Sequence, residues 1–90
     1  MATIQILVKG KVQGVFFRAT ARDVAASMGI RGWVRNTDNG DVEIMASGED
    51  ALLEQLTAWC RKGPPNAVVR EVLVTKMPDS PLPAFTIRRG

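Results

Sequence analysis

Hydrophobic positions along the chain follow two different periods, and each period predicts one kind of element. From residue 3 to 9 apolar residues alternate with polar ones, which is typical of a strand with one buried face. Similar short or valine-rich stretches predict strands at 30–36, 42–46, 67–76 and 84–88. Apolar residues recur at steps of three and four from 17 to 28 and again from 52 to 60, which predicts two amphipathic helices.

Glycine and proline residues mark where these elements end. Gly29 and Gly63 follow the two helical patterns, and Thr37-Asp38-Asn39-Gly40 suits a tight hairpin turn. The expected order is therefore βαββαβ with a short C-terminal strand at a sheet edge. Two βαβ units of this kind predict an α+β, ferredoxin-like (split βαβ) sandwich, with a mainly antiparallel sheet and two helices on one face. A chain of 90 residues is too short for two cores, so we expect residues 1–90 to form one domain.

Composition excludes several kinds of chemistry. The chain has no His and one Cys, which rules out Ser–His and Cys–His pairs, imidazole ligands and a zinc site of several thiolates. We therefore expect no metal and no cofactor. The lone Cys60 cannot form an intramolecular disulfide, so the cytoplasm is the expected compartment. No apolar run approaches the roughly 20 residues that span a bilayer, and we expect no membrane partner.

Positive charge is concentrated in one part of the sequence. The chain has 12 Lys and Arg against 9 Asp and Glu. Between Lys9 and Arg35 all but one of the charged residues are basic, the exception being Asp23. This concentration favours a local anion site over a nucleic-acid coat, although a solvated basic face would look the same.

The connection from residue 10 to 18 is the first candidate for such a site. Gly10 and Gly14 allow the backbone to curl so that successive N–H groups point inward, and the helix that follows adds further free N–H groups. Arg18 lies in the first helical turn, where a cation is unfavourable unless an anion sits beside it. Its planar guanidinium can hold two phosphate oxygens at once. The plain alternative is a glycine turn followed by a surface arginine.

Asn36, at the end of the second predicted strand, is the other candidate. Its amide both donates and accepts hydrogen bonds and could orient a water molecule without transferring a proton. An asparagine before a hairpin turn also commonly bonds to nearby backbone, and that alternative stays open.

Two segments resemble the signatures of the acylphosphatase family. Residues 8–18, Val-Lys-Gly-Lys-Val-Gln-Gly-Val-Phe-Phe-Arg, resemble the first signature, and residues 32–42 with Gly48 resemble the second. The likeness extends through the order of elements to the closing Phe85-Thr86-Ile87-Arg88. It implies that Arg18 binds phosphate and that Asn36 positions water. It further implies a phosphate cradle of loop amides at Lys11, Val12, Gln13, Gly14, Val15 and Phe16.

The resemblance implies a function as well as a site. A protein of this family is expected to hydrolyse the carboxyl-phosphate bond of a small acyl phosphate, without metal, and to release a carboxylate and inorganic phosphate. We expect it to act as a monomer. A non-catalytic, regulatory anion-binding domain is the alternative, because similar domains occur inside larger carbamoyl-transferring maturation proteins. RNA binding is disfavoured because Val42-Glu43-Ile44-Met45-Ala46 offers no aromatic for base stacking, so no nucleic-acid partner is expected.

Overall fold

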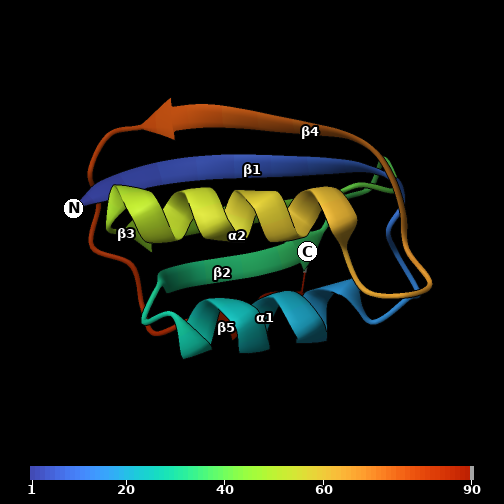
Figure 1. Ribbon diagram of the computed structural model, residues 1–90, viewed down its shortest axis with the longest axis horizontal. Helices are drawn as coiled ribbons and strands as arrows, with labels where there is room; N and C mark the ends of the chain where they lie inside the picture. Colours follow the sequence, from blue (N-terminus) through green and yellow to red (C-terminus); the bar gives the residue numbers. More distant parts are fainter. Residues whose placement is uncertain (90) are drawn as a thin grey trace.

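The computed structural model describes residues 1–89, which form one sheet and two helices (Figure 1). The strands are β1 (Ala2–Lys11), β2 (Arg31–Asn36), β3 (Val42–Gly48), β4 (Val68–Met77) and β5 (Thr86–Ile87). The helices are α1 (Phe17–Ser27) and α2 (Asp50–Lys62). Every element expected from the hydrophobic pattern is therefore present, in the expected order.

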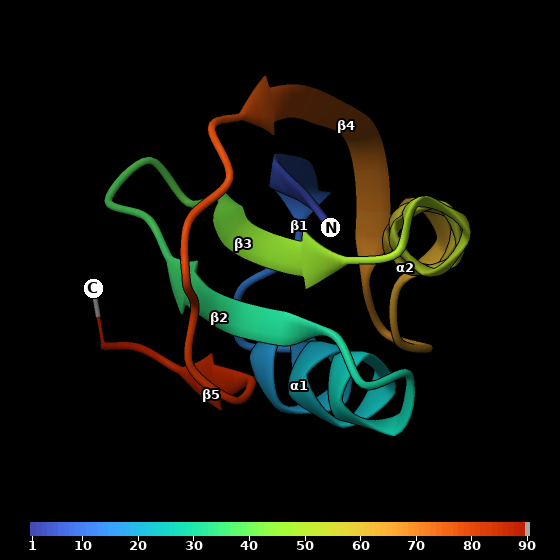
Figure 2. The ribbon, with the colours of Figure 1, turned by 90° about the vertical axis from the view of Figure 1, so that its left-hand side faces the viewer.

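The five strands lie in the order β4-β1-β3-β2-β5. All neighbours are antiparallel except β2 and β5, which are parallel. Both helices cover the same face of the sheet, and β5 forms one edge beside α1 (Figure 2). This arrangement confirms the predicted ferredoxin-like fold, including its short C-terminal edge strand. No helix among the described residues is both long enough and apolar enough to cross a membrane.

The core lies between the sheet and the helices. In β1, Ile4, Ile6 and Val8 are buried, and the register places them opposite Ala46, Ile44 and Val42 of β3. The helices cover these side chains with small and apolar residues: Phe17, Ala21 and Ala25 from α1, and Leu53, Leu56 and Cys60 from α2. Because side chains alternate along a strand, Asn36 of β2, opposite Val42, also lies on the helix-covered face.

The other face of the sheet carries most of the paired charge. Lys9 contacts Asp41 at 2.9 Å, and Arg35 contacts Glu43 at 2.6 Å. Gln5 donates a hydrogen bond to the same Glu43 carboxylate at 2.6 Å. Asp41 and Glu43 are therefore both paired with other side chains on the face of the sheet away from the helices.

One local expectation about β1 was wrong. The strand continues to Lys11 instead of ending at Lys9, because a bulge between Lys9 and Gly10 lets its pairing with β4 continue. Gly10 has a φ of 134°, and a Cβ there would collide with the carbonyl oxygen of Val68. The first glycine therefore permits close approach of β4, and the β1–α1 loop begins only at Val12.

The same requirement for glycine in β2 can be tested. Gly32 has a φ of 143°, and a Cβ would collide with the Met45 carbonyl oxygen of β3, whereas Gly29 has a φ of 71° with open space around it. We expect Gly29→Ala to cost about 1–2 kcal/mol of unfolding free energy through backbone strain. Gly32→Ala should cost at least about 2 kcal/mol more, because a collision is added to the strain. Urea unfolding of both variants measures this difference, and equal losses would contradict it.

Candidate active site

A loop of five residues, 12–16, joins β1 to α1. Its last residue, Phe16, has a φ of 63°, the one positive φ outside glycine among the described residues, and its side chain is 79% exposed. Thr20 holds the Phe16 carbonyl oxygen, to which its backbone N–H donates at 3.1 Å and its Oγ1 at 2.8 Å. The left-handed residue turns the chain sharply into α1, and the first helical turn fixes that reversal.

Gln13 fastens this loop to the β2–β3 hairpin. Its Nε2 donates hydrogen bonds to the carbonyl oxygens of Thr37 and Asp41, both at 2.8 Å. The neighbouring Val12 and Val15 side chains are buried in the core. The loop is therefore held from two sides, by apolar packing below and by an amide bridge to the turn.

The backbone N–H groups of the loop are left without acceptors. Within residues 1–89, none of the N–H groups of residues 12–16 donates a hydrogen bond to another residue. The first N–H groups of any α-helix also lack intrahelical partners, and α1 begins at Phe17. Consecutive free amides at a helix N-terminus form a concavity with partial positive charge, which suits an anion.

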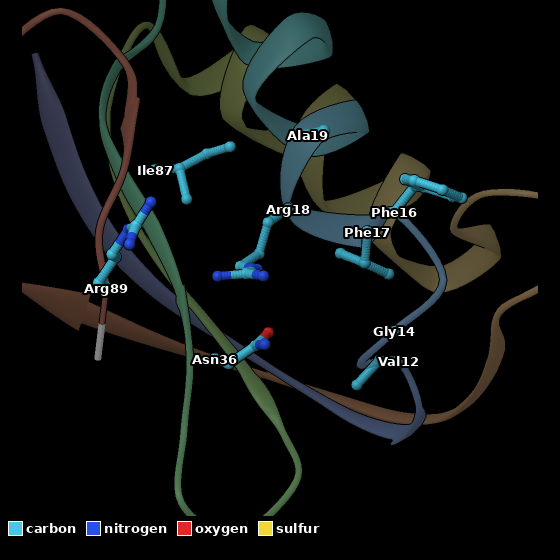
Figure 3. Close-up of a pocket in the computed structure, with 9 residues that line it drawn as sticks. All are labelled: Val12, Gly14, Phe16, Phe17, Arg18, Ala19, Asn36, Ile87 and Arg89. Atoms are coloured by element: carbon cyan, nitrogen blue, oxygen red, sulfur yellow. The ribbon is translucent and has the colours of Figure 1, made fainter.

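A cavity of about 710 Å³ lies against this loop. Val12, Gly14 and Phe16 line it from the loop, Arg18 and Ala19 from α1, and Asn36 from β2. The guanidinium of Arg18 and the amide of Asn36 face one another across it (Figure 3). No acidic side chain lines the cavity, and Arg18 forms no ion pair with any of residues 1–89. The positive charge of Arg18 is thus uncompensated on the side that faces the loop.

Asn36 brings a second unpaired group. Its Oδ1 is buried and has no hydrogen-bond partner among the described residues. A buried acceptor without a partner typically costs about 1–3 kcal/mol. The turn itself is closed by Thr37, whose Oγ1 accepts a hydrogen bond from the Asp41 N–H at 3.1 Å. The alternative in which Asn36 Oδ1 serves to cap the turn is therefore not what the structure contains.

The structure brings together some of the sequence-predicted site residues and separates others. Five of them line the cavity: Val12, Gly14, Phe16, Arg18 and Asn36. The other three do not line it: Lys11 is the last residue of β1, opposite Val68, while Gln13 anchors the loop and Val15 packs in the core.

Sequence reasoning missed four lining residues. Phe17 and Ala19 flank Arg18 in α1, and the other two are Ile87 and Arg89. The latter two come from the C-terminal segment beside β2 and lie two positions apart, as residues on one face of an extended segment do. The sequence alone could have predicted that Ile87 and Arg89 share one face of a strand. It could not predict that this face borders the cavity, because that depends on the pairing of β5 with β2.

Other reactive groups lie away from the cavity. Cys60 is fully buried, and burial raises the pKa of its thiol to about 12, so it is not a thiolate near neutral pH. Residues 1–89 contain no group of three or more His, Cys, Asp or Glu side chains arranged to hold a metal ion.

These features define a small α+β fold with a cavity, bordered by Arg18 and Asn36, where β1 meets α1. The acylphosphatase family model matches residues 4–87, and the chain belongs to the acylphosphatase family. An acylphosphatase of Anaeromyxobacter sp. is 53% identical over 83% of this chain and 81% of its own. The crystal structure of an acylphosphatase from Bacillus subtilis superposes with a TM-score of 0.94, at 34% identity, over 98% of this chain and 99% of that one. Family and fold confirm the expected acylphosphatase, a hydrolase.

A longer protein contains a related domain. The full-length HypF structure, in its phosphate- and nucleotide-bound form, matches with a TM-score of 0.85 at 26% identity. The match covers 97% of this chain but 12% of that one. The same fold therefore occurs both in chains of this size and inside a much larger protein.

The anchoring role of Gln13 gives a test of the loop. In Gln13→Glu a carboxylate replaces the amide that donates to two carbonyl oxygens, so we expect the unfolding free energy to fall by about 1–3 kcal/mol. Gln55→Glu, the same change on the exposed side of α2, is the matched control and should change stability little. Thermal unfolding of both variants measures these changes in stability. An equal loss of stability in Gln13→Glu and Gln55→Glu would contradict the anchoring role.

Proposed function

We propose that this protein hydrolyses acyl phosphates without a metal ion, through phosphate binding by Arg18 and the loop amides and water positioning by Asn36. The observation that carries the proposal is the loop at residues 12–16, whose N–H groups have no acceptor within residues 1–89. Val12, Gly14 and Phe16 of this loop line a cavity shared with Arg18. Membership of the acylphosphatase family supplies the substrate class. In this proposal the backbone amides of residues 11–16 form the phosphate cradle, and the side chains of Gln13 and Val15 hold that loop in place.

Few groups suffice for this reaction. The leaving group is a carboxylate whose conjugate acid has a pKa near ~4, so it departs unprotonated and needs no general acid. The phosphoryl group passes through a loose transition state with charge spread over its equatorial oxygens. Fixed N–H donors and one guanidinium stabilise that charge, and the bidentate fork of Arg18 adds orientation.

The nucleophile in this mechanism is water aligned by Asn36. The buried, unpartnered Oδ1 of Asn36 would accept a hydrogen bond from that water and hold it against the phosphorus atom. Since no carboxylate or imidazole of residues 1–89 lines the cavity as a base, the proton of the water passes to a phosphate oxygen of the substrate.

The remaining expectations stay proposals with simple tests. We propose that the protein is a monomer in the cytoplasm, that residues 1–90 fold as one domain, and that it binds neither nucleic acid nor membrane. Sedimentation and cell fractionation test the first two, and limited proteolysis tests the third. Binding assays with RNA and with vesicles test the last.

One experiment separates the hydrolase from a non-catalytic anion-binding domain, which remains the alternative because the same fold also occurs inside the much longer HypF chain. Benzoyl phosphate is incubated with the purified protein in EDTA, and loss of its ultraviolet absorbance is followed. The proposal predicts enzyme-dependent loss that is proportional to protein concentration and insensitive to EDTA. Phosphate binding without turnover would instead support the regulatory domain, and turnover abolished by EDTA would contradict the metal-free mechanism.

The bidentate role of Arg18 can be tested with a conservative change. Arg18→Ala should abolish measurable turnover, and Arg18→Lys should remain impaired by roughly 100-fold or more, because a point charge cannot replace the planar fork. Arg22→Lys, one turn further along the exposed side of α1, is the matched control and should keep normal activity. Steady-state rates on benzoyl phosphate measure this, and a folded Arg18→Lys protein with near-normal activity would refute the fork.

For Asn36 the expected effect is on catalysis and not on phosphate affinity. Asn36→Ala should reduce kcat by roughly 100–1000-fold, as for other preorganised dipoles, while the inhibition constant of inorganic phosphate stays within about twofold. Asn66→Ala, at an exposed position outside the cavity, serves as control. Loss of phosphate inhibition in Asn36→Ala would place this side chain in the phosphate cradle instead.

A further inference from the structure

We propose that Arg89 binds a second negative group on the acyl part of the substrate, so that this enzyme favours acyl phosphates carrying an additional anionic group. This inference rests on the proposed hydrolysis of acyl phosphates and adds a substrate class to it. It starts from a residue that the mechanism above does not use. Arg89 lines the same cavity as Arg18, although 71 positions separate them in the sequence.

The pairing of β5 with β2 explains how Arg89 reaches the cavity. Trp33 lies opposite Thr86 and Val34 opposite Ile87, in parallel register. The Arg88 N–H continues this pairing, since it donates to the Val34 carbonyl oxygen at 2.8 Å. Two residues beyond the Val34–Ile87 pair, the same register brings Arg89 beside Asn36.

The position of Arg88 shows on which face of the sheet each side chain of the C-terminal segment 87–89 lies. Its guanidinium carbon lies 4.6 Å from the centroid of the Trp33 ring, on the face of the sheet away from the helices. Successive side chains of an extended segment point to opposite faces, so Ile87 and Arg89 both lie on the helix-covered face with Asn36. The two adjacent arginines therefore have different surroundings, one stacked on an indole and the other at the cavity.

The position of Arg89 relative to Arg18 indicates what it could bind. In Figure 3 Arg18 lies in the middle, with the loop at Gly14 on one side and Ile87 and Arg89 on the other. The transferred phosphoryl group, with about −1.5 to −2 charges, is already matched by the loop amides and Arg18. Arg89, the second cation in the cavity, is therefore available to bind a second negative group of the substrate.

Charge in the cavity supports the same conclusion. Two arginines line it without any acidic side chain, and neither forms an ion pair within residues 1–89. Like charges in one cavity repel, and an anion at each guanidinium would relieve that repulsion. Ile87, between them in Figure 3, offers an alkyl surface for the carbon skeleton that links the two negative ends.

Rigid aromatic substrates test the proposal. The set consists of 3- and 4-carboxybenzoyl phosphate and, as neutral counterparts of the same shape, the 3- and 4-carbamoyl compounds. For at least one isomer the wild-type KM should be about 2–5-fold lower with the carboxylate, as expected for a solvent-exposed ion pair. Arg89→Gln should bring that KM ratio to about 1, and raising the salt concentration to 0.5 M should do the same in the wild-type protein.

Arg88→Gln is the matched control, because it removes the same charge one residue away on the other face. It should leave the KM ratio at its wild-type value.

Equal KM values for each carboxylate and its amide in the wild-type protein would overturn the proposal, as would an equal loss of preference in Arg88→Gln. An inhibition constant for inorganic phosphate that rises in Arg89→Gln as much as the KM of the carboxylate would place Arg89 on the transferred phosphate instead. If the wild-type protein hydrolyses none of the substrates, the proposed function fails, whereas hydrolysis with equal KM values refutes the role of Arg89 alone.

Discussion

The short loop from β1 into α1 leaves consecutive backbone N–H groups without an acceptor in the described part of the chain, residues 1–89, and the rest of the site is built around these groups. Five residues must reverse the chain between the sheet and the helix, and the reversal depends on a left-handed Phe16. Unpaired amides are costly when buried, and here Val12, Gly14 and Phe16 of the loop border a cavity that solvent or a ligand can enter. A bound oxyanion would accept hydrogen bonds from several of these N–H groups at once. The same loop geometry that costs the free protein stability is therefore the basis of its proposed chemistry.

The distribution of charge complements this geometry. Asp41 and Glu43 are engaged by Lys9 and Arg35 on the open face of the sheet, and Gln13 uses the Asp41 carbonyl to hold the loop. Acids therefore lie close to the site in sequence but are turned away from it by the alternation of β3. Arg18 lines the cavity without a carboxylate partner among residues 1–89, and its charge remains available to a substrate.

How far the sequence predicts this protein depends on whether the relevant contacts are local. Strand and helix periods, the turn at 37–40 and the positions of Arg18 and Asn36 follow from local pattern and from motif, and the structure places both side chains at one cavity. The role of Gly10 was misjudged because its close neighbour is Val68 of β4, far along the chain. Arg89 was missed for the same reason, since it lines the same cavity as Asn36 only because β5 pairs with β2, far apart in the sequence. The left-handed conformation of Phe16 has no local sequence signal at all, because it is imposed by the fixed ends of the loop.

The central claim is that the amides of residues 12–16 and the guanidinium of Arg18 together bind an oxyanion. The most direct measurement is a titration of the ¹⁵N-labelled protein with inorganic phosphate, followed through the backbone amide resonances. The account predicts the largest saturable shifts at residues 12–16, and their loss in Arg18→Ala while the fold is retained. Shifts that centre elsewhere on the molecule, or unchanged phosphate binding without the guanidinium, would contradict it.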